Sequence, residues 1–171
     1  MKRIGFVLIA LLAISITANA QRFALIDMEY ILEHIPAYNE GMNKLDSKAE
    51  TWQKEIQLIG EQAETMYKNY QNKISTLSDK QRKLEEESII AKEKELAELR
   101  RKYFGPEGEM ATEQNSIIQP IEDAIYQAVK ELSETQGYSV VLDRASATSI
   151  IFASPAIDIS NEVLYKLGYS N

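Results

Sequence analysis

The sequence predicts an α+β fold, in which a long antiparallel helical hairpin with coiled-coil spacing is carried on a small body that contains strands. Three observations predict it. An unbroken apolar spacing of three and four residues runs through the first half of the chain, a helix-start signal follows it, and short β-type segments lie near both ends. Together they describe an arm that leaves the body and returns to it.

The outgoing helix of the arm carries a coiled-coil seam. Its apolar positions alternate intervals of three and four residues over about five heptads, which is the spacing of one helix packed along another. These positions are Ile35, Tyr38, Met42, Leu45, Ala49, Trp52, Ile56, Ile59, Ala63, Met66 and Tyr70. Pro36 suits the first turn of a helix, and a helix over residues 36–75 would be about 60 Å long.

The hairpin turns back near residues 75–79. Ser78 and Gln81 have the spacing of a capping box, which starts a second helix directly after the first one ends. A helix that stops and restarts within a few residues most simply folds back on itself. The returning helix has a looser seam, made of Leu96, Leu99, Tyr103, Met110, Ile117 and Ala124.

A break interrupts the returning helix at residues 104–108. Gly105, Pro106 and Gly108 disrupt intrahelical bonding at a cost of several kcal/mol. One interpretation is a loop or kink that the continuous partner helix tolerates. The other is a hinge at Gly105, Pro106 and Gly108 that lets the outer arm swing.

The body is formed by residues 21–35 and 120–171, and the arm by residues 36–119. We expect a helix to begin near Pro120 and end at Gly137, and a short closing helix over residues 161–167, capped by Ser160 and stopped by Gly168. Period-two segments predict strands over residues 23–28, 138–143 and 150–153.

A body of this size buries too little apolar surface to be secure alone, and a three-stranded sheet leaves open edges. Both problems disappear if copies of the chain pool their strands. We therefore expect oligomerisation through this end, with an interface that includes Phe23, Leu25, Val140, Leu142, Ile151 and Phe152.

The first twenty residues have the layout of a secretory signal peptide. A basic start at Lys2 and Arg3 precedes an apolar run, and the small residues Ala18 and Ala20 predict cleavage after Ala20. A retained membrane anchor is the alternative. The chain contains no cysteine, so neither a disulfide nor a lipidated cysteine is available after export.

Charge is distributed unevenly along the chain. The formal net charge is −7, and removing Lys2 and Arg3 leaves 17 basic and 26 acidic residues, a net charge of −9, which argues against non-specific nucleic-acid binding. Residues 36–103 hold 13 basic and 13 acidic side chains, yet residues 68–83 hold five basic side chains against Asp79 alone. These five are Lys68, Lys73, Lys80, Arg82 and Lys83. They either solvate a coiled-coil surface or attract an anionic partner to the hairpin tip.

Nothing in the sequence favours catalysis, a metal or a cofactor. The chain has one histidine, His34, which cannot form a histidine-based metal cluster alone. The glycines of residues 105–108 are not followed by the Lys-Ser or Lys-Thr pair of a phosphate-binding loop. We therefore expect no catalytic residues and a binding or structural protein.

Three stretches of the mature chain, read together, resemble the Skp/OmpH family of periplasmic chaperones: FALIDMEYILEHIPAY, QPIEDAIYQAVKELSETQGYSVVLDR and IIFASPAIDISNEVLYKLG. The resemblance covers essentially the whole mature chain. It implies a periplasmic homotrimer with a β-barrel body completed by trimerisation and three helical tentacles around a cavity. It also implies an ATP-independent holdase that binds unfolded outer-membrane proteins. Familiar members are basic, whereas this chain is acidic, and the break at residues 105–108 is not typical of their arms.

Under this interpretation, two sets of arm residues would contact the client. The basic tip residues would attract it, and aromatic and thioether side chains would hold it, namely Tyr67, Tyr70, Tyr103, Phe104 and Met110. Seam positions such as Tyr70 are better suited to packing inside the hairpin. The alternative function is a coiled-coil spacer whose basic tips contact anionic lipid or lipopolysaccharide.

Overall fold

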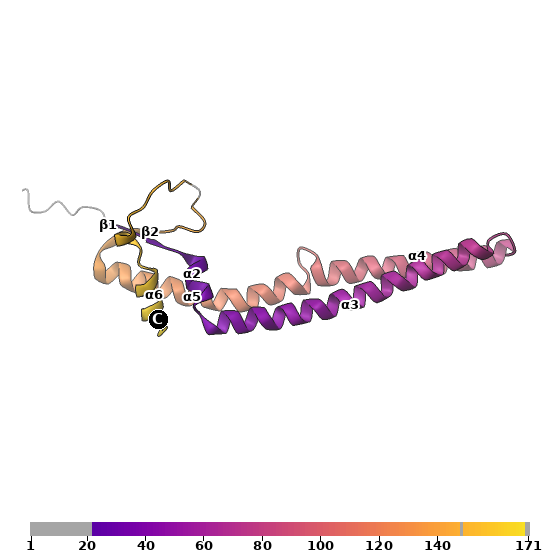
Figure 1. The fold of residues 1–171 in the computed structure, drawn as a ribbon, viewed down its shortest axis with the longest axis horizontal. Helices are drawn as coiled ribbons and strands as arrows, with labels where there is room; N and C mark the ends of the chain where they lie inside the picture. The colour runs from indigo at the N-terminus through magenta and orange to yellow at the C-terminus, as the bar shows by residue number, and fades with distance from the viewer. Residues whose placement is uncertain (1–21, 148, 170–171) are drawn as a thin grey trace, which may run out of the picture. The chain divides into compact units, whose positions relative to one another are not determined.

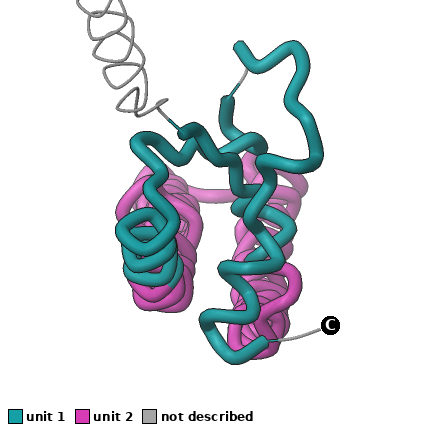
Figure 2. The backbone as a smooth tube through the Cα atoms, turned by 90° about the vertical axis from the view of Figure 1, so that its left-hand side faces the viewer, with its two compact units in different colours: residues 1–31, 125–171 teal, residues 32–124 magenta. Residues whose placement is uncertain are grey.

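A computed structural model describes residues 22–147 and 149–169 of the chain (Figure 1). The predicted signal peptide, residues 1–20, lies outside the described residues. The described elements follow the order β1, α2, α3, α4, α5, β2, the 3₁₀ turn η2 and α6. The chain divides into two compact units, which Figure 2 colours separately: residues 32–124 form one, and the described parts of residues 1–31 and 125–171 form the other.

The outgoing arm helix α3 spans Pro36–Lys73, with proline in its first turn, as the sequence predicts. All eleven predicted seam positions are buried or partly buried. The other α3 residues are exposed, apart from Gly41 and Gly60. The seam prediction is therefore confirmed.

The returning helix α4 spans Asp79–Phe104 and lies beside α3 (Figure 1). Its start is held by the predicted residue pair, because the Ser78 backbone N–H donates to Gln81 Oε1 at 3.0 Å. The α4 seam is more polar than expected. Its buried and partly buried positions are Arg82, Glu85, Ile89, Lys92, Leu96, Leu99 and Tyr103.

The break in the return is a loop between two helices, since α4 ends at Phe104 and α5 spans Glu109–Gln136. A helix start near Pro120 is wrong, because Pro120 lies inside the continuous α5. A proline removes one backbone hydrogen bond, and the apolar stripe of α5 keeps the helix in place on both sides of it. Ala124 is exposed, so it is not a seam residue; the partly buried Ile121 and the buried Ile125 continue the stripe.

The other unit contains a two-stranded parallel sheet. Strand β1 (Arg22–Ile26) pairs with β2 (Tyr138–Asp143), and the register sets Phe23 opposite Val140 and Leu25 opposite Leu142. The predicted third strand is wrong for the single chain, since residues 150–153 form no strand. A strand needs a neighbour for its backbone hydrogen bonds, and no described segment pairs with residues 150–153.

Three short helical elements complete the description. Helix α2 spans Met28–Glu33, which the sequence did not indicate, η2 spans Pro155–Ile157, and α6 spans Ser160–Lys166. Positive φ angles of 76° at Gly137 and 88° at Gly168 end α5 and the α6 region, as predicted for these two glycines. Ile31, Ile125 and Val163 are the largest fully buried side chains of this unit.

Candidate functional site

The arm exposes large apolar side chains on both of its helices. On α3 they are Leu58, Tyr67 and Ile74 at its end, and on α4 they are Leu84, Ile90 and Phe104. Ile90 is 62% exposed and Tyr67 is 48% exposed, so these side chains do not belong to the seam. Single exposed apolar residues are common on protein surfaces, so the arrangement of these six decides whether they can form a binding surface.

Four of these side chains lie on the same flank of the hairpin. Tyr67, Ile90 and Phe104 each follow a seam position by one residue, and Ile74 lies seven residues after Tyr67, directly after the end of α3. Successive residues turn about 100° around a helix, so in two antiparallel helices that face each other these positions lie on the same side of both. We call these four residues the apolar flank. On each helix the two flank residues are separated by a multiple of seven: seven from Tyr67 to Ile74, and fourteen from Ile90 to Phe104. Residues at such intervals align along a helix.

The opposite flank is polar and connects the helices through charges. Lys48 Nζ lies 2.5 Å from Glu113 Oε1, and Lys102 Nζ lies 3.4 Å from Glu109 Oε1. Lys48, Lys102 and Glu109 each precede a seam position by one residue, and Glu113 precedes the partly buried Gln114. Leu58 and Leu84 also precede seam positions, so they are the apolar side chains exposed on this side. The hairpin therefore has two chemically different flanks.

The structure separates the five aromatic and thioether residues that the sequence suggested for client contact. Tyr67 and Phe104 are exposed and lie on the apolar flank, and Met110 is partly buried. Tyr70 and Tyr103 are 7% and 6% exposed, because both rings pack in the seam. Sequence reasoning missed Ile74 and Ile90; the rule of one position after the seam would have found Ile90.

Hydrogen bonds to carboxylates hold both buried tyrosines. Tyr103 donates its hydroxyl to Glu55 Oε2 at 2.7 Å, and Tyr70 donates to Glu86 Oε1. The hydrogen bond with Glu55 raises the pKa of Tyr103, and the hydrogen bond with Glu86 raises the pKa of Tyr70. Both hydroxyls therefore remain donors at neutral pH.

The basic tip residues have acidic neighbours that the window of residues 68–83 left out. Lys68 pairs with Glu64, Lys73 Nζ lies 3.0 Å from Glu85 Oε1, and Lys83 Nζ lies 3.9 Å from Glu87 Oε1. The hydrogen bond from Lys68 lowers the pKa of Glu64.

The two remaining tip cations differ from each other. Arg82 Nε donates to the Leu77 carbonyl at 3.2 Å, whereas Lys80 makes no hydrogen bond or ion pair with the described residues. Over residues 64–87 five basic and five acidic side chains balance to zero. The tip therefore presents paired charges, with Lys80 as the least shielded cation.

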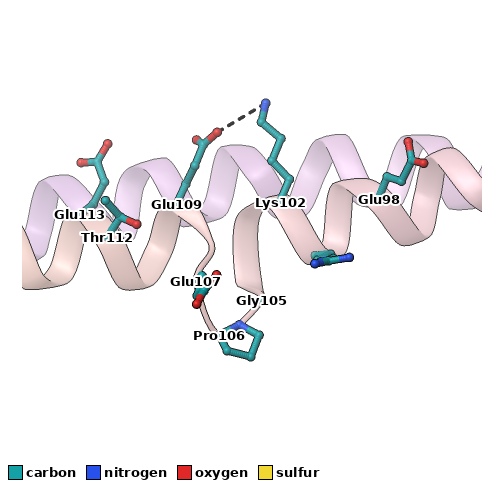
Figure 3. Close-up of a pocket in the computed structure, with 9 residues that line it drawn as sticks. Glu98, Lys102, Gly105, Pro106, Glu107, Glu109, Thr112 and Glu113 are labelled. Atoms are coloured by element: carbon teal, nitrogen blue, oxygen red, sulfur yellow. Dashed lines mark ion pairs between the residues drawn. The ribbon is translucent and has the colours of Figure 1, made fainter.

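The loop of residues 105–108 projects from the line of α4 and α5 (Figure 3). Gly105 N–H donates to the Arg101 carbonyl at 2.9 Å, and Gly108 N–H donates to the Gly105 carbonyl at 2.9 Å. A Cβ on Gly105 would lie 2.4 Å from the Arg101 carbonyl oxygen, and one on Gly108 would lie 2.9 Å from the Lys102 carbonyl oxygen. The glycines are thus needed for close backbone packing.

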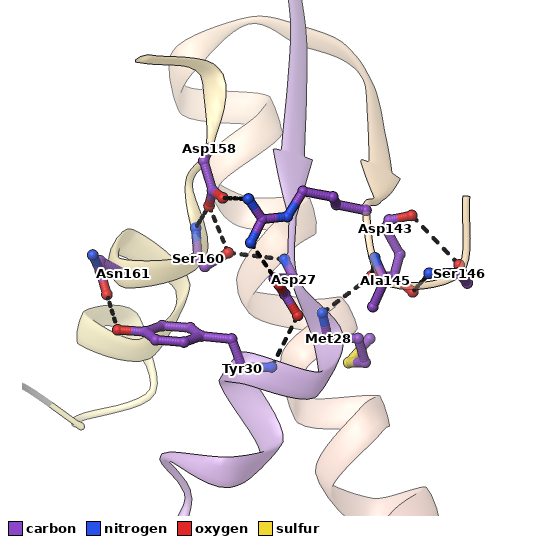
Figure 4. A network of polar contacts seen from close by, with 10 residues as sticks. Asp27, Met28, Tyr30, Asp143, Ala145, Ser146, Asp158, Ser160 and Asn161 are labelled. Atoms are coloured by element: carbon purple, nitrogen blue, oxygen red, sulfur yellow. Dashed lines mark hydrogen bonds and ion pairs between the residues drawn. The ribbon is translucent and has the colours of Figure 1, made fainter. Parts of the chain in front are cut away.

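A polar network joins three segments of the strand-bearing unit (Figure 4). Asp27 Oδ1 accepts from the Tyr30 N–H at 2.9 Å, and Asp27 Oδ2 lies 2.6 Å from Arg144 Nη2. Arg144 also lies 3.7 Å from Asp158, and Ser160 Oγ accepts from the Asp27 N–H at 2.9 Å. The hydrogen bond from Tyr30, followed by that from Arg144, lowers the pKa of Asp27. The network ties the end of β1 to the loop after β2 and to the start of α6.

Asp143, at the end of β2, forms further hydrogen bonds in the same region. Its Oδ1 accepts from the Met28 N–H at 3.1 Å and from the Ala145 N–H at 3.0 Å (Figure 4). Burial acts to raise the pKa of Asp143, but the hydrogen bonds from Ser146, Met28 and Ala145 outweigh it and lower that pKa. These contacts are structural, since they consume the carboxylate's hydrogen-bonding capacity within the fold.

The residues predicted for an oligomer interface lie at the surface, with one exception. Phe23, Val140 and Leu142 are exposed, Phe152 is 84% exposed and Ile151 is fully exposed. Leu25 is buried within the chain, and its backbone pairs both with β2 and, through an isolated bridge, with Asp158. Strand β2 has one edge that no described segment pairs.

Two further kinds of feature are absent from the described part of the chain. Residues 22–147 and 149–169 contain no group of three or more His, Cys, Asp or Glu side chains placed to hold a metal ion. Among those same residues, no helix combines the length and apolar content that crossing a membrane requires.

Comparison with known proteins places the chain in a family. A crystal structure of a Caulobacter crescentus CB15 protein assigned to the OmpH-like outer membrane chaperones matches with a TM-score of 0.65 at 14% identity. The match covers 86% of this chain and 83% of the other, and at this identity it shows a shared fold. No curated protein matches the sequence. The family model described as outer membrane protein (OmpH-like) matches residues 22–167. The chain, whose paired arm helices and small parallel sheet are now described, belongs to this OmpH-like family.

Proposed function

We propose that this protein is an ATP-independent holdase chaperone of the periplasm, which binds unfolded outer-membrane proteins between helical arms and prevents their aggregation. Membership in the OmpH-like family supports a chaperone role, as does the fold shared with the C. crescentus protein assigned to outer membrane chaperones. The basic, apolar and small residues of positions 1–20 support export.

The exposed apolar flank is the observation that carries the proposal. Tyr67 and Ile74 on α3, and Ile90 and Phe104 on α4, offer separated contacts along one side of a hairpin. The two contacts on α3 are seven residues apart, or about 10 Å, and the two on α4 are fourteen residues apart, or about 21 Å. Weak contacts of this kind suit a partner with no fixed structure, because each one binds apolar side chains without requiring a defined shape. Holding chains apart prevents the strand pairing that leads to aggregation.

We propose that the functional form is a homotrimer with a β-barrel body. The unpaired edge of β2 and the exposed Ile151 and Phe152 support pooling of strands between copies. Residues 150–153, which form no strand within the chain, would pair in the assembly. Such pairing would also cover Phe23, Val140 and Leu142.

A urea-unfolded outer-membrane β-barrel protein, diluted into buffer with and without the mature chain, tests the proposal by light scattering. We expect suppression that saturates near one client per three chains. The double variant Tyr67→Gln/Ile90→Gln should suppress scattering less well, because it removes one apolar contact from each helix. Its matched control is Leu58→Gln/Leu84→Gln, which removes one exposed apolar side chain from each helix on the opposite flank.

Two results would contradict parts of the proposal. Equal loss of suppression in both double variants would show that binding is not confined to the apolar flank. Unimpeded aggregation with the wild-type chain would exclude the holdase function. In that case, retention of anionic lipid or lipopolysaccharide vesicles, weakened by Lys80→Gln/Lys83→Gln, would favour the alternative in which exposed tip cations contact a membrane surface.

A further inference from the structure

We propose that the arm opens from its tip, and that an aromatic clamp formed by Trp52, Tyr103 and Phe104 stops the opening before it reaches the loop of residues 105–108. The distal hairpin, residues 59–99, would separate as a unit, and the loop would stay closed. This inference goes beyond the proposed function, because it concerns the arm with no client bound.

The seam of the distal hairpin is poorly apolar on its α4 side. Arg82, Glu85 and Lys92 occupy three of its six seam positions. Ile89 is the only buried α4 side chain in this section, and Leu96 and Leu99 are partly buried. On the α3 side the buried residues are Ala63 and Tyr70. A hairpin with so little buried apolar surface has low local stability, because packing of an apolar face supplies most of a helix's stability.

The charges at these positions do not replace the missing packing. Lys92 Nζ pairs with Glu95 Oε2 at 2.7 Å along the same helix, so it does not connect α4 to α3. Lys73 and Glu85 do connect the helices, but their side chains are 46% and 36% exposed. Exposed ion pairs of this kind contribute little, because water screens them and the side chains lose entropy.

The clamp lies where the distal hairpin meets the base of the arm. The rings of Trp52 and Tyr103 stack with centroids 5.1 Å apart and planes 7° apart, and Phe104 meets Trp52 edge-on at 6.1 Å. The Tyr103 hydroxyl bonds Glu55 on α3, as the Tyr70 hydroxyl bonds Glu86 in the distal hairpin, so the stacked rings are what distinguish the clamp. Tyr103 is buried and Trp52 partly buried in this stack, and Phe104 adds an edge-on contact although its ring is partly exposed. Stacked rings packed between two helices fasten those helices more firmly than surface charges do.

The loop beside the clamp is closed rather than extended. Gly108 is buried, its N–H donates to the Gly105 carbonyl, and its own carbonyl accepts from the Thr112 N–H at 3.0 Å. The Lys102 and Glu109 ion pair connects the two sides of the loop (Figure 3). A hinge needs backbone torsions that can change, and a backbone packed this closely on itself resists such change.

Opening of the distal hairpin would uncover additional apolar surface. Tyr70 and Ile89 are buried in the closed arm, and each lies a few residues from a member of the apolar flank, Tyr67 and Ile90 respectively. An opened arm would therefore present a wider apolar surface than the closed one. The clamp would limit how much of the arm can contribute to it.

Hydrogen exchange of the full mature chain, followed by mass spectrometry without client, tests the inference. We expect backbone amides of residues 62–73 and 82–97 to exchange together and at least about tenfold faster than those of residues 45–55 and 109–117. Gly105 and Gly108 amides should exchange no faster than the distal hairpin, because both are hydrogen-bonded.

Lys92→Leu and Lys94→Leu are matched variants for the weak seam. Lys92 occupies a seam position with a side chain 25% exposed, whereas the Lys94 side chain is 76% exposed and points away from the seam. We expect Lys92→Leu to slow exchange throughout the distal hairpin by about tenfold, and Lys94→Leu to leave it unchanged. Equal effects of the two variants would overturn the role of the polar seam.

Trp52→Leu and Trp52→Phe test the clamp. Trp52→Leu should extend the fast-exchanging section into residues 45–55 and 103–112, and Trp52→Phe, which keeps an aromatic ring in the stack, should extend it less. An unchanged boundary in Trp52→Leu would overturn the clamp. Faster exchange at residues 103–110 than in the distal hairpin of the wild-type chain would overturn the whole inference in favour of a hinge.

Discussion

Gly41 marks a close approach between α3 and α5. A Cβ at this position would lie 2.6 Å from Ile117 Cγ2, and Ile117 is β-branched, so its side chain cannot easily move aside. Gly41→Ala should therefore destabilise the arm by about 1–3 kcal/mol, despite the better helix propensity of alanine. Urea unfolding followed by circular dichroism measures the change.

Gly60→Ala is the control for this prediction. Its Cβ would lie 3.9 Å from Leu96, an ordinary contact, so the substitution should stabilise the helix by about 0.5–1 kcal/mol. Ile117→Ala should cost less stability in the Gly41→Ala background than in the wild-type chain, because it relieves the steric conflict there. If both glycine variants shift the midpoint in the same direction, close packing at Gly41 is not the reason for the glycine.

Asp27 is expected to make the strand-bearing unit sensitive to acid. Its pKa is lowered in the folded chain by the Tyr30 N–H and by Arg144, so the folded state favours the ionised carboxylate. This stabilisation is complete above the unfolded pKa near 3.8 and is lost as the pH falls through the lower folded value. Wild-type stability should therefore fall below about pH 4 more steeply than that of Asp27→Asn.

Denaturant unfolding between pH 2.5 and pH 7 measures this difference. Asp27→Asn should cost about 1 kcal/mol or less at pH 7, because it loses a partly exposed ion pair and keeps an oxygen that can accept from Tyr30. Asp46→Asn is the control, since Asp46 is exposed on α3 and has no hydrogen bond with the described residues. Parallel pH profiles for the wild-type chain and Asp27→Asn would contradict the assignment.

At the scale of elements, Pro120 distinguishes the observed helix from the expected one. Inside α5 a proline costs up to about 3 kcal/mol relative to alanine, so Pro120→Ala should stabilise the chain by about 1–3 kcal/mol. If a helix began at Pro120 instead, the proline would be favourable there and the same substitution would be neutral or destabilising.

Pro36→Ala is the matched substitution at a true helix start. Pro36 occupies the first turn of α3, where its missing N–H has no intrahelical partner to lose. We expect the urea unfolding midpoint of Pro36→Ala to equal that of the wild-type chain or to fall slightly below it. The same urea titration measures this. A rise as large as that of Pro120→Ala would mean that the two prolines do not differ in helix position.

Periodicity predicted α3 correctly and could not detect the loop in the return. Each α3 seam residue has a fixed spacing to the next, and those positions are buried because one apolar stripe faces one partner. From Tyr103 to Met110 the interval is seven residues, so the apolar pattern continues in phase across the loop. Only the glycines and the proline revealed the break. Its closed conformation came from backbone contacts that no pattern encodes.

At the scale of the whole molecule, the exposed residues 151 and 152 predict association. Phe152→Asp should reduce the oligomer measured by sedimentation equilibrium, because it places a charge on apolar surface that another copy would bury. Tyr165→Asp is its control, since Tyr165 is 76% exposed and lies outside the predicted interface. A monomeric wild-type chain, or equal dissociation of both variants, would contradict strand pooling.

The sequence by itself determined the long hairpin, its turn at Ser78, the glycines that end α5 and the α6 region, and the family resemblance. Helix periodicity and capping are local, so neighbouring residues are enough to specify them. The tertiary structure decided which tyrosines are buried, which residues form the apolar flank, how the loop closes and that β1 pairs with β2 in parallel. Each of these features depends on contacts between residues that are more than a hundred positions apart or that lie on different helices. Packing decides such contacts, and the spacing of residues along the chain does not.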